Sequence, residues 1–117
     1  MGSLQTQLTW YHMAQTSHVP TIEDLYAKRD EIHRVVQAHG ADNIRVFGSV
    51  ARNEADSKSD IDFLVDIVAD VHGFDYFGLL EDLRRALSKL LGRHVHVVDS
   101  ANLQRIKERV LQDAIPL

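Results

Sequence analysis

The stretch GSVARNEADSKSDID, residues 48–62, combines a Gly-Ser turn with two aspartates that lie one residue apart. The run Ile44–Phe47 just before it is β-branched and aromatic, which predicts a buried strand that ends at Gly48. A tight turn followed by the start of a short helix would direct free backbone N–H groups and the Ser49 hydroxyl toward an anion. Gly48 and Ser49 are therefore predicted to bind phosphate.

The two aspartates, Asp60 and Asp62, belong to a segment, Ser59–Asp66, whose pattern suits a half-buried strand. Side chains two residues apart on a strand point to the same face, so both carboxylates are expected on one face. Such a pair can hold one or two hard divalent cations, which bridge to substrate phosphates. A Gly-Ser turn or an Asp-x-Asp alone is usually structural, whereas the combination at this spacing indicates a metal-dependent nucleotidyl-transfer site.

The spacing G-S-x(2)-R-x-E-x(4)-S-D-x-D resembles the signature of the DNA polymerase β-like nucleotidyltransferase superfamily. The segments FDYFGL (residues 74–79) and LLGR (residues 90–93) also look like those of the minimal nucleotidyltransferases (MNT proteins), the antitoxin partners of HEPN-domain toxins. The resemblance runs from Ile22 to the C-terminus. It implies a polymerase β-like nucleotidyltransferase fold.

The resemblance also implies a reaction, in which AMP passes from ATP to a tyrosine hydroxyl of a HEPN RNase toxin and silences it. In that interpretation Gly48 and Ser49 hold the triphosphate, and Asp60 and Asp62 bind Mg²⁺. Arg52 is either a further phosphate contact or a solvated arginine at a helix end.

Two further acidic residues fall near this site in the sequence. Asp66 lies in phase with Asp60 and Asp62 but too far along the strand for the same ion, and it is interpreted as a nucleotide-binding residue on the adenosine side or as a strand-end residue. Glu54 is predicted to anchor the loop through a hydrogen bond.

The third predicted strand departs from the family pattern. MNT proteins usually carry G-R-x-V-D there, and this chain has GRHVHVV at residues 92–98, so that His96 stands at the acidic position. Strand parity directs His96 toward Asp60 and Asp62. Imidazole suits Zn²⁺, Ni²⁺ or Mn²⁺ better than Mg²⁺, and it can also act as a general base near neutral pH. Asp99 has the opposite phase and is predicted to cap the following helix.

Composition limits the classes of function that the chain can have. The chain has 117 residues, 44% of them hydrophobic, and a net charge of -4, so we expect one core and no grip on a nucleic-acid backbone. Cysteine is absent, and no apolar run approaches the roughly 20 residues of a membrane span. We expect a cytoplasmic domain with a protein partner and no membrane or direct nucleic-acid contact. The sequence leaves open a homodimer or a hetero-oligomer with the toxin.

Periodicity predicts the remaining elements. A helix capped by Thr21 should run to near Gly40, and a second should begin at a cap on Asp75, bury Phe77 among other residues, and end at Gly92. A closing helix over residues 102–114 should turn Leu103, Ile106, Val110 and Leu111 inward, with Pro116 ending it. The fold class is α/β, with a small mixed sheet covered mainly on one face by helices.

The domain is assigned to residues 21–117, and residues 1–20 to a disordered N-terminal extension or a remnant of recombinant expression. Two other functions remain open. One is a catalytically weakened or inactive MNT antitoxin that neutralises its toxin by binding, and the other is a small-molecule nucleotidyltransferase, which the short chain disfavours.

Overall fold

The computed structural model describes residues 18–102 and 107–117. The elements are, in chain order, α2 (Ile22–Ala27), α3 (Arg29–Ala38), β1 (Ala41–Phe47), α4 (Gly48–Ala51), β2 (Ile61–Ile67), α5 (Phe74–Leu91), β3 (Val95–Asp99), the 3₁₀ turn η1 (Ser100–Asn102), α6 (Lys107–Asp113) and β4 (Ile115–Pro116). Most of the predicted N-terminal extension, and the predicted inward residues Leu103 and Ile106, lie outside the described residues. Within the described part of the chain, no helix is both long and apolar enough to cross a membrane.

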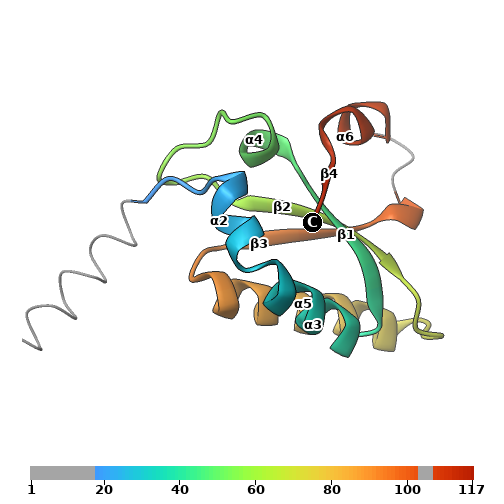
Figure 1. Cartoon of the computed structure of the whole chain (residues 1–117). Helices are drawn as coiled ribbons and strands as arrows, with labels where there is room; N and C mark the ends of the chain where they lie inside the picture. Colours follow the sequence, from blue (N-terminus) through green and yellow to red (C-terminus); the bar gives the residue numbers. More distant parts are fainter. Residues whose placement is uncertain (1–17, 103–106) are drawn as a thin grey trace, which may run out of the picture.

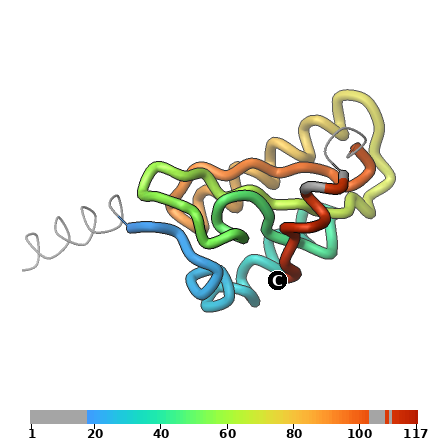
Figure 2. The backbone as a smooth tube through the Cα atoms, turned by 90° about the horizontal axis from the view of Figure 1, so that it is seen from above, coloured from blue at the N-terminus to red at the C-terminus, as the bar shows by residue number. Residues whose placement is uncertain are grey.

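The strands form one mixed sheet in the order β3-β2-β1-β4. β1 pairs antiparallel with β2 and β4, whereas β2 and β3 are parallel neighbours, which can be followed from above in Figure 2. A parallel pair needs a crossover connection, and α5 provides it. The predicted α/β fold with a small mixed sheet is confirmed.

Helices α3 and α5 cover one face of the sheet, and α4 and α6 lie on the other side (Figure 1). The main core lies under α3 and α5 and includes Phe63, Val65, Leu83 and Val95, each fully buried. A smaller cluster under α6 joins Leu64 to Val110, with Phe47 and Val98 packed against it. Since Asp62 shares the face of Leu64, the carboxylates lie on the more thinly covered side.

The first predicted helix is two helices. Thr21 caps α2 with a capping box, as predicted, in which its hydroxyl accepts from the Asp24 N–H and the Asp24 carboxylate accepts from the Thr21 N–H. The expectation of one continuous helix is wrong, because the chain leaves helical geometry at Lys28. The Lys28 ammonium donates to the Leu90 carbonyl at the end of α5, which ties this junction to the second helix.

Four details of the C-terminal half differ from the predictions, and two agree with them. α5 begins after Gly73 rather than at a cap on Asp75, and Phe77 is 68% exposed rather than inward. Gly92 closes α5 in the left-handed conformation, as predicted. On α6, Val110 is buried as expected but Leu111 is 49% exposed. Pro116 belongs to the short edge strand β4, a position that tolerates proline because its missing N–H faces away from the ladder.

Candidate active site

Two aspartates and two histidines meet where β2 and β3 begin. Asp60 immediately precedes β2, and Asp62 is the second residue of that strand. In the parallel ladder Asp62 is directly opposite His96, and the Ile61 N–H donates to the His94 carbonyl. The pairing therefore brings the four side chains to one face of neighbouring strands.

Distances show that these side chains form one cluster. His96 Nδ1 lies 3.2 Å from Asp62 Oδ1, and His96 Nε2 lies 3.5 Å from Asp60 Oδ2. His94 Nδ1 lies 3.5 Å from Asp60 Oδ1. The aspartates are partly buried and the histidines exposed, so the cluster is open to a ligand. Sequence reasoning put His94 on this face but gave it no role, although its spacing of two from His96 was a usable signal.

Burial and neighbouring charges act in opposite directions on Asp62. Burial raises the pKa of the Asp62 carboxyl above its ordinary value, and the nearby Asp60 charge acts in the same direction. His96 opposes both through its charge and its hydrogen bond, and Arg52 opposes them more weakly. Burial outweighs the opposing contacts, so the pKa of Asp62 is raised overall.

Gly48 brings the predicted phosphate turn against the carboxylates. Its φ is +74°, a left-handed conformation that favours glycine. A Cβ added at this position would overlap the Asp62 carboxylate oxygen Oδ2, so the backbone of the turn touches the side chain of Asp62. Ser49 follows within α4, half-buried, and its carbonyl accepts from the Glu54 N–H at 2.8 Å. The turn and the carboxylate pair are thus one structural unit.

Arg52 is the exposed C-cap residue of α4, a helix-end position as one of the two predictions had it, and it lies between two carboxylates. Its Nε donates to Glu54 at 3.0 Å, and its Nη1 donates to Asp113 of α6 at 2.7 Å. Glu54, followed by Asp113, raises the pKa of the guanidinium above its ordinary value. Arg52 therefore joins α4 to α6, and Glu54 takes part in the hydrogen-bond anchor that was predicted for it.

Asp66 lies further along β2 in a network of three donors. It accepts from Arg45 at 2.6 Å, from Asn43 at 2.9 Å and from Ser100 at 2.5 Å. Although burial raises its pKa, the bonds from Ser100 and Asn43 and the charge of Arg45 together hold the pKa of Asp66 below its ordinary value. In this arrangement Asp66 links β1, β2 and η1, and no nucleotide contact can be read from it.

Asp99 caps the short 3₁₀ turn η1, whereas the prediction had it cap the closing helix, and α6 begins only at Lys107. Its Oδ1 accepts from the Ala101 N–H at 3.0 Å, and its Oδ2 accepts from the Tyr76 hydroxyl at 2.5 Å. The side chain is buried, and its register partner is Val65 rather than either site aspartate. Asp99 consequently does not supply the missing third carboxylate.

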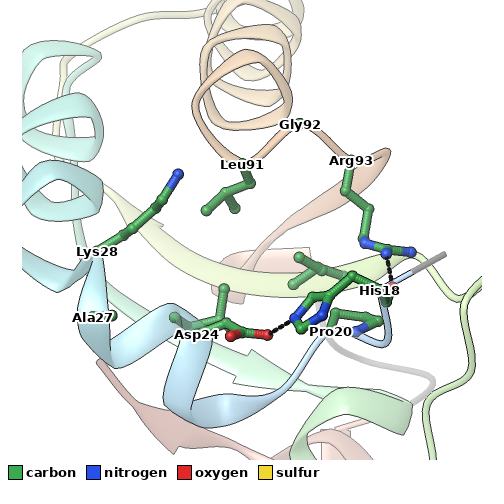
Figure 3. Close-up of a pocket in the computed structure, with 10 residues that line it drawn as sticks. His18, Pro20, Asp24, Ala27, Lys28, Leu91, Gly92 and Arg93 are labelled. Atoms are coloured by element: carbon green, nitrogen blue, oxygen red, sulfur yellow. Dashed lines mark hydrogen bonds and ion pairs between the residues drawn. The ribbon is translucent and has the colours of Figure 1, made fainter. Parts of the chain in front are cut away.

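Arg93, next to His94, holds the loop that leads into Asp60. Its Nη1 donates to the carbonyls of Ser57 and Ser59 at 3.0 Å each, and its Nη2 donates to the His18 carbonyl. Figure 3 shows Arg93 at the rim of a hollow of about 410 Å³ between α2 and the end of α5. Ile61 lines that hollow, and since successive strand residues face opposite ways, it lies on the side away from Asp62. Sequence reasoning missed this role because the contact spans more than 30 residues.

A family profile described as "Nucleotidyltransferase domain" matches residues 29–116, which include the turn, the aspartates and both histidines. The chain belongs to the nucleotidyltransferase domain family. It is accordingly a transferase domain, and its site residues lie within the matched part.

Known proteins similar to this nucleotidyltransferase domain agree with the assignment. Two proteins of Methanocaldococcus jannaschii carry the names "Putative protein adenylyltransferase MJ0435" and "Putative protein adenylyltransferase MJ0128". The first is 33% identical over 69% of this chain and 84% of its own length, and the second is 32% identical over 83% and 95%. A solved structure described as "Structure of putative minimal nucleotidyltransferase" is 40% identical, with a TM-score of 0.67, over 84% of this chain and 97% of that one.

Proposed function

We propose that this nucleotidyltransferase transfers AMP from ATP to a tyrosine hydroxyl of a cognate HEPN-domain RNase toxin and thereby acts as its antitoxin. The observation that carries the proposal is the contact between the Gly48 backbone and the Asp62 carboxylate, which joins a phosphate-sized turn to a carboxylate pair. The names of the two archaeal relatives support a protein as the acceptor. The MNT-like segments at residues 74–79 and 90–93 support the HEPN partner.

Each residue of the site has a role in this proposal. The backbone at Gly48 and Ser49 holds the triphosphate, and Asp60 and Asp62 hold Mg²⁺ or Mn²⁺, for which their partly exposed oxygens are suitable donors. A divalent ion there neutralises charge on the reacting phosphates and polarises the attacking oxygen. Arg52 supports the phosphates by exchanging one of its carboxylate partners, and Asp66 lies on the nucleoside side.

The reaction balances without a further reagent. The tyrosine oxygen forms a bond to the α-phosphorus of ATP, and the bond from that phosphorus to the pyrophosphate oxygen breaks, so that pyrophosphate leaves. The hydroxyl proton must pass to a base at the site or to solvent. His96, oriented by its contact with Asp62, either accepts that proton or completes the ligand set.

A specific observation also favours the alternative of an antitoxin that only binds. His96 lies against both carboxylates, 3.2 Å from Asp62 and 3.5 Å from Asp60, where it competes with a hard cation for the same oxygens. In that case the toxin would be neutralised by a covered surface. The two functions differ in one measurable respect, the covalent modification of the toxin.

The test is to incubate the full chain with the proposed HEPN-domain toxin, ATP, and Mg²⁺ or Mn²⁺, and to record the intact mass of the toxin. We expect a gain of one or more AMP groups together with loss of RNase activity. The double variant D60A/D62A should abolish the mass gain while still binding the toxin. Asp70→Ala, at a 95% exposed side chain in the loop after β2, is the matched control and should modify normally. A toxin that is inhibited but never gains mass would refute adenylylation and support the binding-only function.

A further inference from the structure

Asp60, His94 and His96 present one ligand atom each in a cluster whose atoms all lie within 4.8 Å of one another. His94 Nδ1 lies 3.5 Å from Asp60 Oδ1, and His96 Nε2 lies 3.5 Å from the other carboxylate oxygen, Oδ2. Zinc binds imidazole nitrogen and carboxylate oxygen at about 2.0–2.2 Å, so neighbouring ligands of a tetrahedral ion lie roughly 3.4 Å apart. Small side-chain rotations would therefore bring all three atoms around one ion.

His96 is oriented like a histidine metal ligand whose other ring nitrogen is hydrogen-bonded to a carboxylate. His96 Nδ1 faces the Asp62 carboxylate at 3.2 Å, where an N–H on that nitrogen would donate to it. The other ring nitrogen, Nε2, faces Asp60 at 3.5 Å. Histidine ligands of metals commonly donate their other N–H to a carboxylate in this way, which fixes the tautomer and the ring.

The backbone holds the three residues in fixed relation. His96 is the second residue of β3 and His94 immediately precedes that strand, with their rings edge to face at a centroid distance of 5.4 Å. Asp60 is tied to the same strand because the adjacent Ile61 N–H donates to the His94 carbonyl, and because Arg93 binds the loop before Asp60. A site on paired strands is more rigid than one on loops, which favours selective binding.

We propose that Asp60, His94 and His96 bind a transition-metal ion of the Zn²⁺ class in preference to Mg²⁺, with Asp62 as the partner that orients His96. Two imidazoles and one carboxylate suit Zn²⁺ or Co²⁺ better than Mg²⁺, which prefers oxygen ligands. Three protein ligands leave a position open for a phosphate oxygen. The inference rests on the function proposed above, and it replaces the Mg²⁺ or Mn²⁺ held there by Asp60 and Asp62 with a Zn²⁺-class ion held by Asp60, His94 and His96.

The test is a titration of the full chain with Co²⁺ in the absence of nucleotide, followed by visible absorption, with Zn²⁺ and Mg²⁺ as competitors. We expect the intense visible bands of a four- or five-coordinate Co²⁺ ion, displaced by Zn²⁺ at least 100-fold more effectively than by Mg²⁺. His94→Ala and His96→Ala should each weaken binding at least tenfold, and Asp62→Asn should weaken it about 10- to 100-fold through loss of the orienting contact. His72→Ala, at an 88% exposed loop histidine, should bind normally.

The possible outcomes distinguish failure of the proposed metal site from failure of the proposed adenylylation. Binding that is unchanged in His94→Ala, or equal displacement by Mg²⁺ and Zn²⁺, would overturn the inference and leave the histidines as simple partners of the aspartates. Circular dichroism of each variant shows whether the fold is retained. A chain that binds Co²⁺ through these residues but never modifies the toxin would keep the metal site and refute adenylylation. Mg²⁺-supported adenylylation that persists in His94→Ala would keep the proposed reaction and refute the proposed metal site.

Discussion

Replacing Gly48 with alanine tests whether the phosphate turn and the carboxylates form one unit. Gly48 has a φ of +74°, and an alanine in the left-handed region costs about 1–2 kcal/mol. The new Cβ would also overlap the Asp62 carboxylate, which must rotate away and lose its contact with His96. A lost hydrogen bond of this kind adds about 1 kcal/mol, so we expect Gly48→Ala to lower the free energy of unfolding by about 2–3 kcal/mol.

Gly92 offers the matched control. Its φ is +64°, close to that of Gly48, yet a Cβ added there meets no atom within 4 Å. Gly92→Ala should therefore carry only the backbone strain and lose about 1–2 kcal/mol. Urea denaturation measures both values, and with a slope near 1 kcal/mol/M the strain alone moves the midpoint by about 1–2 M.

The decisive measurements are metal binding and adenylylation rather than stability. Under conditions where both variants are folded, Gly48→Ala should lose metal binding and adenylylation together, because Asp62 is displaced, whereas Gly92→Ala should retain them. If Gly48→Ala keeps normal binding, or if Gly92→Ala loses it equally, the inferred contact between the turn and Asp62 has no functional weight.

Three further substitutions probe groups around the site. Arg93→Ala removes two hydrogen bonds to the loop before Asp60, so we expect a loss of about 1–3 kcal/mol in urea denaturation and weaker Co²⁺ binding; unchanged binding would show that the loop holds Asp60 unaided. Tyr76→Phe leaves an oxygen of the buried Asp99 without its phenol donor and should cost about 1–2 kcal/mol. Because burial and then Asp99 raise the pKa of Tyr76 to about 12, wild type should also lose stability relative to Tyr76→Phe as the pH rises from about 10 toward 12. For Asp66 the folded pKa is lowered, so its contribution is present above its unfolded value near 3.9 and is lost as the pH falls through the folded pKa. The free energy of unfolding of Asp66→Asn, measured by denaturation, should accordingly fall less steeply with acid than that of wild type. Identical acid profiles would contradict a stabilising role for the hydrogen bonds to Asp66.

Local signals were sufficient for most of the elements. The capping box at Thr21, the left-handed end at Gly92 and the apolar strand of β2 each depend on neighbours within a few residues. The break at Lys28 had no glycine or proline to mark it, since it accompanies a contact with Leu90 that is 62 residues away. Such an ending depends on tertiary packing and leaves no local pattern.

Two other features that the prediction missed, the exposure of Phe77 and the strand β4, also depend on tertiary packing. Phe77 follows the helical spacing of the buried leucines, but its side chain is exposed, whereas the adjacent Tyr76 contacts Asp99. β4 comprises only Ile115 and Pro116, and two residues carry no alternation that would predict a strand. Its existence depends on β1 offering a free edge, which only the assembled sheet provides.

The candidate site was more accessible to sequence reasoning than the packing because strand parity is a strict rule. One residue of register separates His96, opposite Asp62, from Val97, which packs into the main core. The same rule puts Asp99 three residues on, where it is buried, so a small slip or bulge cannot recruit it without breaking its hydrogen bonds from the Tyr76 hydroxyl and the Ala101 N–H. No acidic residue of β3 can therefore replace the carboxylate that the family pattern has at position 96. Under the proposed function, catalysis must therefore proceed with His94 and His96 at this position, and the cation that they favour is what the Co²⁺ titration measures.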